Sequence, residues 1–270
     1  MVKHLLHRVP QRSDISPTTL SVGRFRIRYT YFRSSETRAH DDIGQDYLLF
    51  TGSPDKLAFC LCDGVSQSFY GDLAARFLGD HLVDWLWDLP ALPTKNLTAR
   101  KKLSSQLKDW IVAARMAVEV FPIPFNAPPL LKGVLEEKRS IGSESMFVCG
   151  RWDVGHQTQK KTSLMLFWLG DSRFQLWKSN ELRSDATPTE WDSMERWSTL
   201  NGVKGGEPNV CIEPKGKTDR ILVFSDGMVP IESMLASADD EQLNQFLVDL
   251  NETPTSDDAS LFDIALVPEP

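Results

Sequence analysis

The chain contains 270 residues, of which 41% are hydrophobic and 25% are charged, and its formal net charge is -7. These values are typical of a globular protein with a sizeable core, and the acidic balance argues against a nucleic-acid backbone as the main partner. The sequence lacks a run of about 18 apolar residues that could cross a membrane, and no cysteine pair has C-x-x-C spacing. We therefore expect a cytoplasmic protein that binds neither membranes nor nucleic acid.

For the first half of the chain, the sequence predicts a poorly ordered N-terminal segment followed by strands and two helices. Residues 1–20 are polar and contain two prolines, which predicts a poorly ordered N-terminal lead-in. Alternating apolar residues predict a half-buried strand over 24–31, and the apolar run 57–62 predicts a buried strand. Helical spacing of apolar residues predicts helices over 71–87 and 98–120, and the proline-rich stretch that follows ends the second helix.

From residue 141 onward, strand signals dominate. Short β-rich runs separated by turns predict strands at 145–150, 163–170, 172–178, 220–225 and 261–267. Residues 185–219 read as a long irregular connection, in which Trp191 and Trp197 are candidate substrate contacts, and a last helix is expected at about 239–250. Strands bracket helices at both ends, so we expect an α+β fold with mainly antiparallel sheets and a single domain over 21–270.

Carboxylates occur repeatedly at the ends of these strands. They are Asp46 before its strand, Asp63, Asp171 and Asp226 after theirs, and Asp257 and Asp258 before the last one. A single Asp at a strand end is more often a turn residue than a ligand. Taken as a set, clustered carboxylates repel one another unless a cation lies among them, and hard divalent cations with oxygen ligands are the natural occupants. We hypothesise a divalent metal site.

The order of these motifs resembles that of the metal-dependent type 2C protein serine/threonine phosphatases, the PPM family. The stretches that carry the resemblance are "IGQDYLLF", "CDGVSQSFYGDLAARFL", "GSESMFV", "LGDSRFQLW", "VFSDGM" and "DDASLFDIAL", over about residues 23–267. Each motif alone is weak, but six in the family's order make a strong signal. The resemblance implies a four-layer α-β-β-α sandwich, with two mainly antiparallel sheets flanked by helices.

The resemblance also implies a site and a reaction. The metal ligands would be Asp46, Asp63, Asp226 and Asp257, with the backbone carbonyl of Gly64, around two Mg²⁺ or Mn²⁺ ions. In the family, a water activated by the two metals attacks the phosphorus of phosphoserine or phosphothreonine in line. The implied function is a cytoplasmic signalling hydrolase, a monomeric phosphatase that acts on a phosphorylated protein substrate and is paired with a cognate serine/threonine kinase.

Several positions depart from the family pattern. The family's phosphate-binding arginine would stand at Asp41, so Arg38 and Arg33 are the remaining candidates for the substrate phosphate. Asp258 replaces the usual Asn and could support the ligands from behind or bind a metal itself. The family assigns Asp171 to a structural hairpin, and it is left out of the ligand set.

Two further departures leave an alternative open. The loop Val65-Ser66-Gln67 lacks the family's glycine and its histidine, a proposed general acid, and Glu144 replaces the usual Thr. The missing arginine and this altered loop are compatible with a pseudophosphatase that keeps the fold as a protein-binding regulatory module. The four retained aspartates favour the active enzyme. A two-metal nuclease is disfavoured by the net charge and by the motif order.

Overall fold

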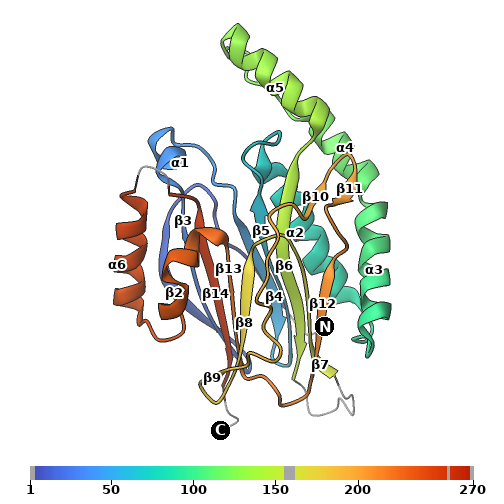
Figure 1. Ribbon diagram of the computed structural model, residues 1–270, viewed down its shortest axis with the longest axis vertical. Helices are drawn as coiled ribbons and strands as arrows, with labels where there is room; N and C mark the ends of the chain where they lie inside the picture. The colour runs from blue at the N-terminus through green and yellow to red at the C-terminus, as the bar shows by residue number, and fades with distance from the viewer. Residues whose placement is uncertain (1–3, 155–161, 254–255, 268–270) are drawn as a thin grey trace.

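The computed structural model describes residues 4–154, 162–253 and 256–267, which form four layers in the order helix, sheet, sheet, helix (Figure 1). All paired strands in these residues are antiparallel. The expected four-layer α-β-β-α sandwich is therefore confirmed. None of the described helices is long and apolar enough to cross a membrane.

The first sheet is built around the long strand β6, which pairs with β5 on one side and with both β7 and β10 on the other. The order is β1-β4-β5-β6-β10-β11, with β12 joined through β7. Its strands are β1 (Leu5–Arg8), β4 (Tyr47–Ser53), β5 (Lys56–Gly64), β6 (Glu144–Asp153), β7 (Thr162–Leu169), β10 (Arg196–Ser198), β11 (Gly202–Lys204) and β12 (Asn209–Pro214).

The second sheet runs in the order β2-β3-β14-β13-β8-β9. Its strands are β2 (Ile15–Val22), β3 (Phe25–Phe32), β8 (Arg173–Lys178), β9 (Glu181–Leu182), β13 (Arg220–Phe224) and β14 (Ala259–Leu266). The alternation predicted for 24–31 is confirmed, because Phe25, Ile27, Tyr29 and Tyr31 are all buried on one face of β3. Together with Phe50 and Phe59 of the first sheet, they fill the layer between the two sheets.

Helices cover both outer faces. The described helices are α1 (Ser35–Ala39), α2 (Gly71–Asp88), α3 (Asn96–Asp109), α4 (Ile111–Val120), α5 (Pro129–Ile141), the 3₁₀ helix η1 (Asp226–Met234) and α6 (Asp240–Asn251), of which α5 extends away from the sheets. Buried residues of α2, α3 and α4 pack on the first sheet, and η1 and α6 pack on the second. The helices predicted at 71–87 and 239–250 are confirmed, the latter beginning with a capping box of Asp239 and Gln242.

The prediction of a poorly ordered lead-in is wrong for residues 4–20. Leu5–Arg8 forms β1 at the edge of the first sheet, and Ile15–Val22 forms β2 at the edge of the second. Gln11, between them, is buried, and its side-chain amide donates to the carbonyl oxygens of Gly44 and Asp46 at 3.0 Å each. β1 is ordered by pairing with the distant strand β4, and β2 by pairing with the next strand, β3; local composition does not reveal either pairing.

Two helical predictions change in detail. The helix expected over 98–120 is divided into α3 and α4 at Trp110. The proline-rich stretch does end α4, but a further helix, α5, follows it and was not expected. Pro129 occupies its first turn, where a missing backbone N–H costs nothing.

Candidate metal centre

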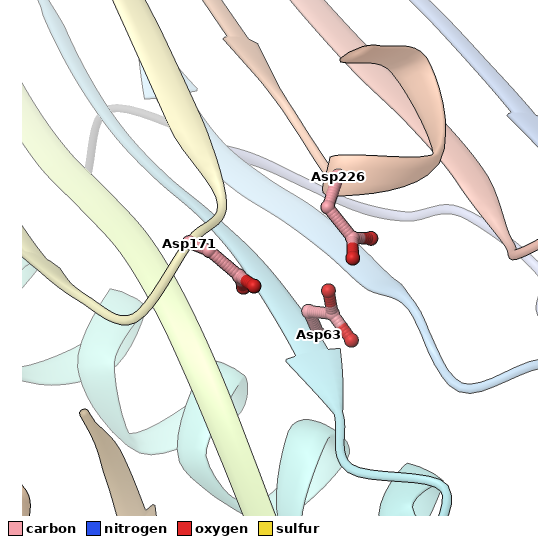
Figure 2. Close-up of side chains that lie close together, drawn as sticks. All are labelled: Asp63, Asp171 and Asp226. Carbon is pink, nitrogen blue, oxygen red and sulfur yellow. The ribbon is translucent and has the colours of Figure 1, made fainter. Parts of the chain in front are cut away.

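Three aspartates converge at one end of the sandwich. One carboxylate oxygen from each of Asp63, Asp171 and Asp226 lies within 4.8 Å of the others (Figure 2). Asp63 is near the end of β5, Asp226 directly follows β13 at the start of η1, and Asp171 lies in the turn between β7 and β8. Strands from both sheets therefore deliver carboxylates to one point, as the position of acids at strand ends suggested.

Asp171 is the member that the sequence prediction excluded. In this structure its turn is not a hairpin, because it connects β7 of the first sheet to β8 of the second, and it aims the carboxylate at Asp63 and Asp226. Its Oδ1 atom is buried and has no hydrogen-bond partner among the described residues. A buried carboxylate oxygen without a donor is costly, so an electropositive group is expected to complete it.

The electrostatics of the cluster favour a bound cation. Burial and then the charges of Asp46 and Asp226 raise the pKa of Asp63 well above its usual range. Burial raises the pKa of Asp226 to about 6, with further contributions from the charges of Asp257 and Asp171. Burial also raises the pKa of Asp171. At neutral pH these carboxylates repel one another, and a divalent cation would relieve that repulsion.

The other two predicted carboxylate ligands lie close enough for their charges to act on Asp63, but they are outside the tight group of three. Asp46 is buried, and its Oδ2 accepts a hydrogen bond of 2.6 Å from the Ser260 hydroxyl. Asp257 is exposed to solvent and accepts a bond of 2.8 Å from the backbone N–H of Asp258. The ligand roles of Asp46 and Asp257 stay predictions.

Gly64 allows two parts of the backbone to cross beside the cluster. A Cβ atom at this position would lie 2.4 Å from the carbonyl carbon of Gly71, at the start of α2. Gly227 has a similar role, because its Cβ would lie 2.1 Å from the carbonyl oxygen of Asp258. Each glycine directly follows an aspartate of the cluster. The close backbone contact at the glycine therefore fixes the position of the aspartate before it.

Asp258 joins the segments around Asp46. Its buried carboxylate accepts hydrogen bonds from the Tyr31 hydroxyl at 2.9 Å and from the backbone N–H groups of Ser34 at 2.6 Å and Asp46 at 3.3 Å, as well as from that of Gln45. A neutral Asn has only one acceptor oxygen and could not accept all of these bonds equally well. The structure thus places Asp258 behind Asp46, which is the supporting position allowed by the sequence.

The candidate phosphate ligands have other contacts. Arg33 donates from Nε to Asp14 Oδ1 at 3.3 Å and from Nη1 to the carbonyl of Asp42 at 3.2 Å, and it lies 3.6 Å from Asp41 Oδ1. Arg38 is half-buried in α1. The acid that replaces the family's arginine, Asp41, therefore lies against one of its proposed substitutes.

Arg173 is a cation that the sequence prediction missed. It begins β8, two residues after Asp171, and its charge lowers the pKa of both Asp171 and Asp226 against the effect of burial. Its Nη1 donates to Glu232 Oε2 at 2.6 Å, and its buried Nε has no partner among the described residues. The "GDSR" stretch contained the signal, because it brings Arg173 to the same end of the sheet as Asp171.

Glu144 connects the long 185–219 segment to the strand beside Asp63. Its buried carboxylate forms ion pairs with Arg196 Nε at 2.8 Å and with Lys204 Nζ at 2.6 Å. Glu144 thus replaces Thr with an anchor for β10 and β11. The prediction that Trp197 contacts substrate is wrong, because this residue is fully buried and donates to the carbonyl of Leu107 at 3.1 Å. Trp191 is half-buried and packs near Phe174.

The comparisons with known proteins concern this fold. No family model matches the sequence, and no curated protein matches it. Among solved structures, the serine/threonine phosphatase Stp1 from Staphylococcus aureus has 16% identity and a TM-score of 0.58, covering 96% of this chain and 100% of that one. Serine-threonine phosphatase 2C from Toxoplasma gondii has 13% identity and a TM-score of 0.56, covering 97% and 99%.

A third solved structure, a point variant of a bacterial serine phosphatase, has 18% identity and a TM-score of 0.53, covering 90% of this chain and 98% of that one. The chain is therefore an α+β sandwich with an acidic cluster at one end of its sheets. Its fold is that of the type 2C serine/threonine phosphatases, as the motif order implied.

The raised carboxylate pKa values predict how stability depends on pH without metal. A carboxyl whose folded pKa exceeds its unfolded value of 3.8 stabilises the fold below that value, and this contribution is lost as the pH rises through the folded pKa, about 6 for Asp226. With a chelator present, Asp171→Asn should therefore be more stable than wild type at pH 8, and the difference should shrink toward pH 4.5. Urea unfolding measures it.

The matched control is Asp84→Asn, which removes an exposed carboxylate from α2 and should change stability little at either pH. A wild type as stable as Asp171→Asn at pH 8 would show that the cluster carboxylates do not repel one another.

Gly64→Ala should disturb the crossing of β5 and α2. The added Cβ must displace the backbone of Gly71, and overpacking of this kind costs about 1–3 kcal/mol in the free energy of unfolding. Gly133→Ala is the control, since its Cβ meets no atom within 4 Å and it lies in the helix α5, where Ala is favoured by up to about 1 kcal/mol. Chemical unfolding of both variants tests this, and equal stability of Gly64→Ala and wild type would contradict it.

Proposed function

We propose that this protein is a Mg²⁺- or Mn²⁺-dependent protein phosphatase that hydrolyses phosphoserine and phosphothreonine. The observation that carries the proposal is the convergence of Asp63, Asp171 and Asp226 at the ends of strands from both sheets. The fold adds support, since several solved proteins that share it are named serine or serine/threonine phosphatases.

The donor set fits hard divalent cations. All three groups offer carboxylate oxygens, which Mg²⁺ and Mn²⁺ prefer, and nitrogen or sulfur ligands are absent from this group. The buried Oδ1 of Asp171 without a donor, and the raised pKa values of all three carboxyls, are both what a site built around positive charge would have in the absence of its ion.

The residues that would hold the ions come from the cluster and from the sequence prediction. Asp63 and Asp226 belong to both, Asp171 is added by the geometry, and Asp46, Asp257 and the Gly64 carbonyl are proposed from the family resemblance. When bound, a pair of divalent cations supplies activation of water at neutral pH and neutralisation of phosphoryl oxygens.

Other residues of the chain would orient the ligands and receive the substrate. The Ser260 hydroxyl holds the carboxylate of Asp46, and Asp258 holds its backbone N–H, so this side chain is preorganised. Arg173 places positive charge beside Asp171 and Asp226, where a dianionic phosphate would need it. Arg33 and Arg38 are the phosphate ligands proposed from sequence, and Arg33 would have to exchange its bonds to Asp14 and Asp42.

The proposed substrate is a phosphorylated protein rather than a small molecule. A cognate serine/threonine kinase would then be the enzyme that supplies it.

Substituting single ligands tests the function. Wild type should hydrolyse a phosphothreonine peptide only when Mn²⁺ or Mg²⁺ is present, and Asp63→Asn and Asp226→Asn should each lower the rate by more than about 100-fold, because each removes a charged ligand. Asp84→Asn, on the exposed face of α2, is the control and should keep the wild-type rate.

The same assay separates the active enzyme from the binding module. If calorimetry shows that wild type binds Mn²⁺ but no phosphopeptide is hydrolysed, the result would favour a pseudophosphatase. Activity that survives both substitutions would show that the reaction uses another site.

A further inference from the structure

The segment from α4 to α5, residues 111–141, exposes several large apolar side chains, and we call it the apolar arm. Its exposed large apolar side chains are Val112, Met116, Val120, Phe125, Leu130, Leu131, Val134 and Ile141. Leu130 is 82% exposed and Val120 is 79% exposed. In Figure 1, α5 projects away from the layered body of the protein. Contiguous apolar surface of this kind commonly marks an interaction site.

The helix α5 has little support of its own. It has 13 residues, none of them buried, and contains Gly133 in its interior. Isolated helices shorter than about 12–15 residues are marginal in water, and an interior glycine weakens them further. A surface that covers the apolar face of α5 would stabilise it.

In the structure α5 extends away beyond the end of α4 instead of folding back along it (Figure 1). Pro122, Pro124 and Pro128 stiffen the connection between the two helices. At the other end of α5, Arg139 donates to the carbonyl of Phe121 and lies over the Phe69 ring at 5.0 Å. This contact joins the end of α5 to the end of α4, while the rest of α5 points away, so the exposed apolar side chains of the two helices do not face each other within one molecule.

The exposed rows of side chains on α5 and α4 are both apolar, and they carry opposite charges. On α5, Leu130, Val134, Glu137 and Ile141 are spaced by four, three and four residues, so an acid lies in the apolar row. On α4, Val112, Met116 and Val120 are spaced by four, and Arg115 adjoins them one turn from Val112. Glu137 and Arg115 are exposed and neither has an ion-pair partner among the described residues, although Arg115 donates from Nη2 to the carbonyl of Leu200 at 3.2 Å.

From this complementarity we infer that the apolar arm is the interface of a two-fold dimer, in which α5 of each copy packs along α4 of the other. Each copy carries both halves of the contact, which is what an isologous interface requires, and the two-fold axis doubles the buried area. Glu137 of one copy then meets Arg115 of the other, twice per dimer. The inference is independent of the proposed reaction.

The helix α5 of the proposed dimer is also connected to the loop beside the candidate metal centre. Lys138 of α5 donates from Nζ to the carbonyl of Ser66 at 3.1 Å, and the N–H of Phe69 donates to the carbonyl of Gly142 at 3.0 Å. The end of α5 is thus tied to the loop that directly follows Asp63 and Gly64.

Sedimentation velocity of the full chain over a range of concentrations tests the interface. Wild type should dimerise, and Met116→Glu and Leu130→Glu should each weaken the dimer at least tenfold in dissociation constant. Both side chains are exposed, so the variants should fold as wild type does, which thermal unfolding checks. The control is Leu97→Glu, at a side chain of α3 that is 63% exposed and outside the arm, and it should dimerise like wild type.

A charge exchange makes the test specific to the proposed pairing. Glu137→Arg and Arg115→Glu should each weaken the dimer, and the double variant should restore it, since the charges again complement each other between copies. A wild type that stays monomeric at all concentrations would overturn the inference and agree with the monomer expected from sequence. A dimer that survives all the arm variants would overturn it too, because the contact would lie elsewhere.

Discussion

Mutual repulsion among carboxylates at one end of the sandwich is the constraint on which the other features depend. Asp63, Asp171 and Asp226 reach the same point from three different strand ends, and their raised pKa values express the cost of that placement. Such an arrangement persists only when the surrounding structure is rigid enough to impose it. The apolar layer between the sheets, with Phe50 and Phe59 fully buried, provides that rigidity.

The parts around the cluster act by limiting backbone movement. Gly64 and Gly227 permit backbone crossings too close for any side chain, and Asp258 collects hydrogen bonds from Tyr31, Ser34 and Asp46. None of these groups needs to touch a substrate. Together they keep the strand ends from separating under the repulsion of their own aspartates, which leaves a concentrated negative charge for a divalent cation to neutralise.

Sequence patterns predicted the elements whose signals are local. The alternation of β3 and the helical spacing of α2 each follow from side chains within a single element, and both are present. The strand β1 escaped prediction because its partner, β4, lies about 40 residues further along the chain. The strand β2 pairs with its neighbour β3, but its polar composition and Pro17 concealed it. The helix α5 escaped because its apolar residues have no core to face, and because prolines near its start read as a stop.

In the candidate site, too, local sequence signals predicted some residues, and the tertiary structure was needed for others. The strand-end pattern contained Asp63, Asp171 and Asp226 alike, and it was the family resemblance that kept Asp63 and Asp226 as ligands and left Asp171 out. Only the stacking of the two sheets reveals that the turn of Asp171 also faces the other two acids. Similarly, Trp197 looked like a surface aromatic in an irregular segment, yet that segment is anchored by Glu144 and buries the indole.

The most direct measurement is the anomalous scattering of Mn²⁺ in crystals of the protein grown at neutral pH with the ion in excess. We predict a peak at the cluster, about 2.0–2.3 Å from carboxylate oxygens of Asp63 and Asp226. A cluster without a peak at saturating Mn²⁺, or with its three carboxylates turned away from one another, would contradict a metal centre at this end of the sandwich.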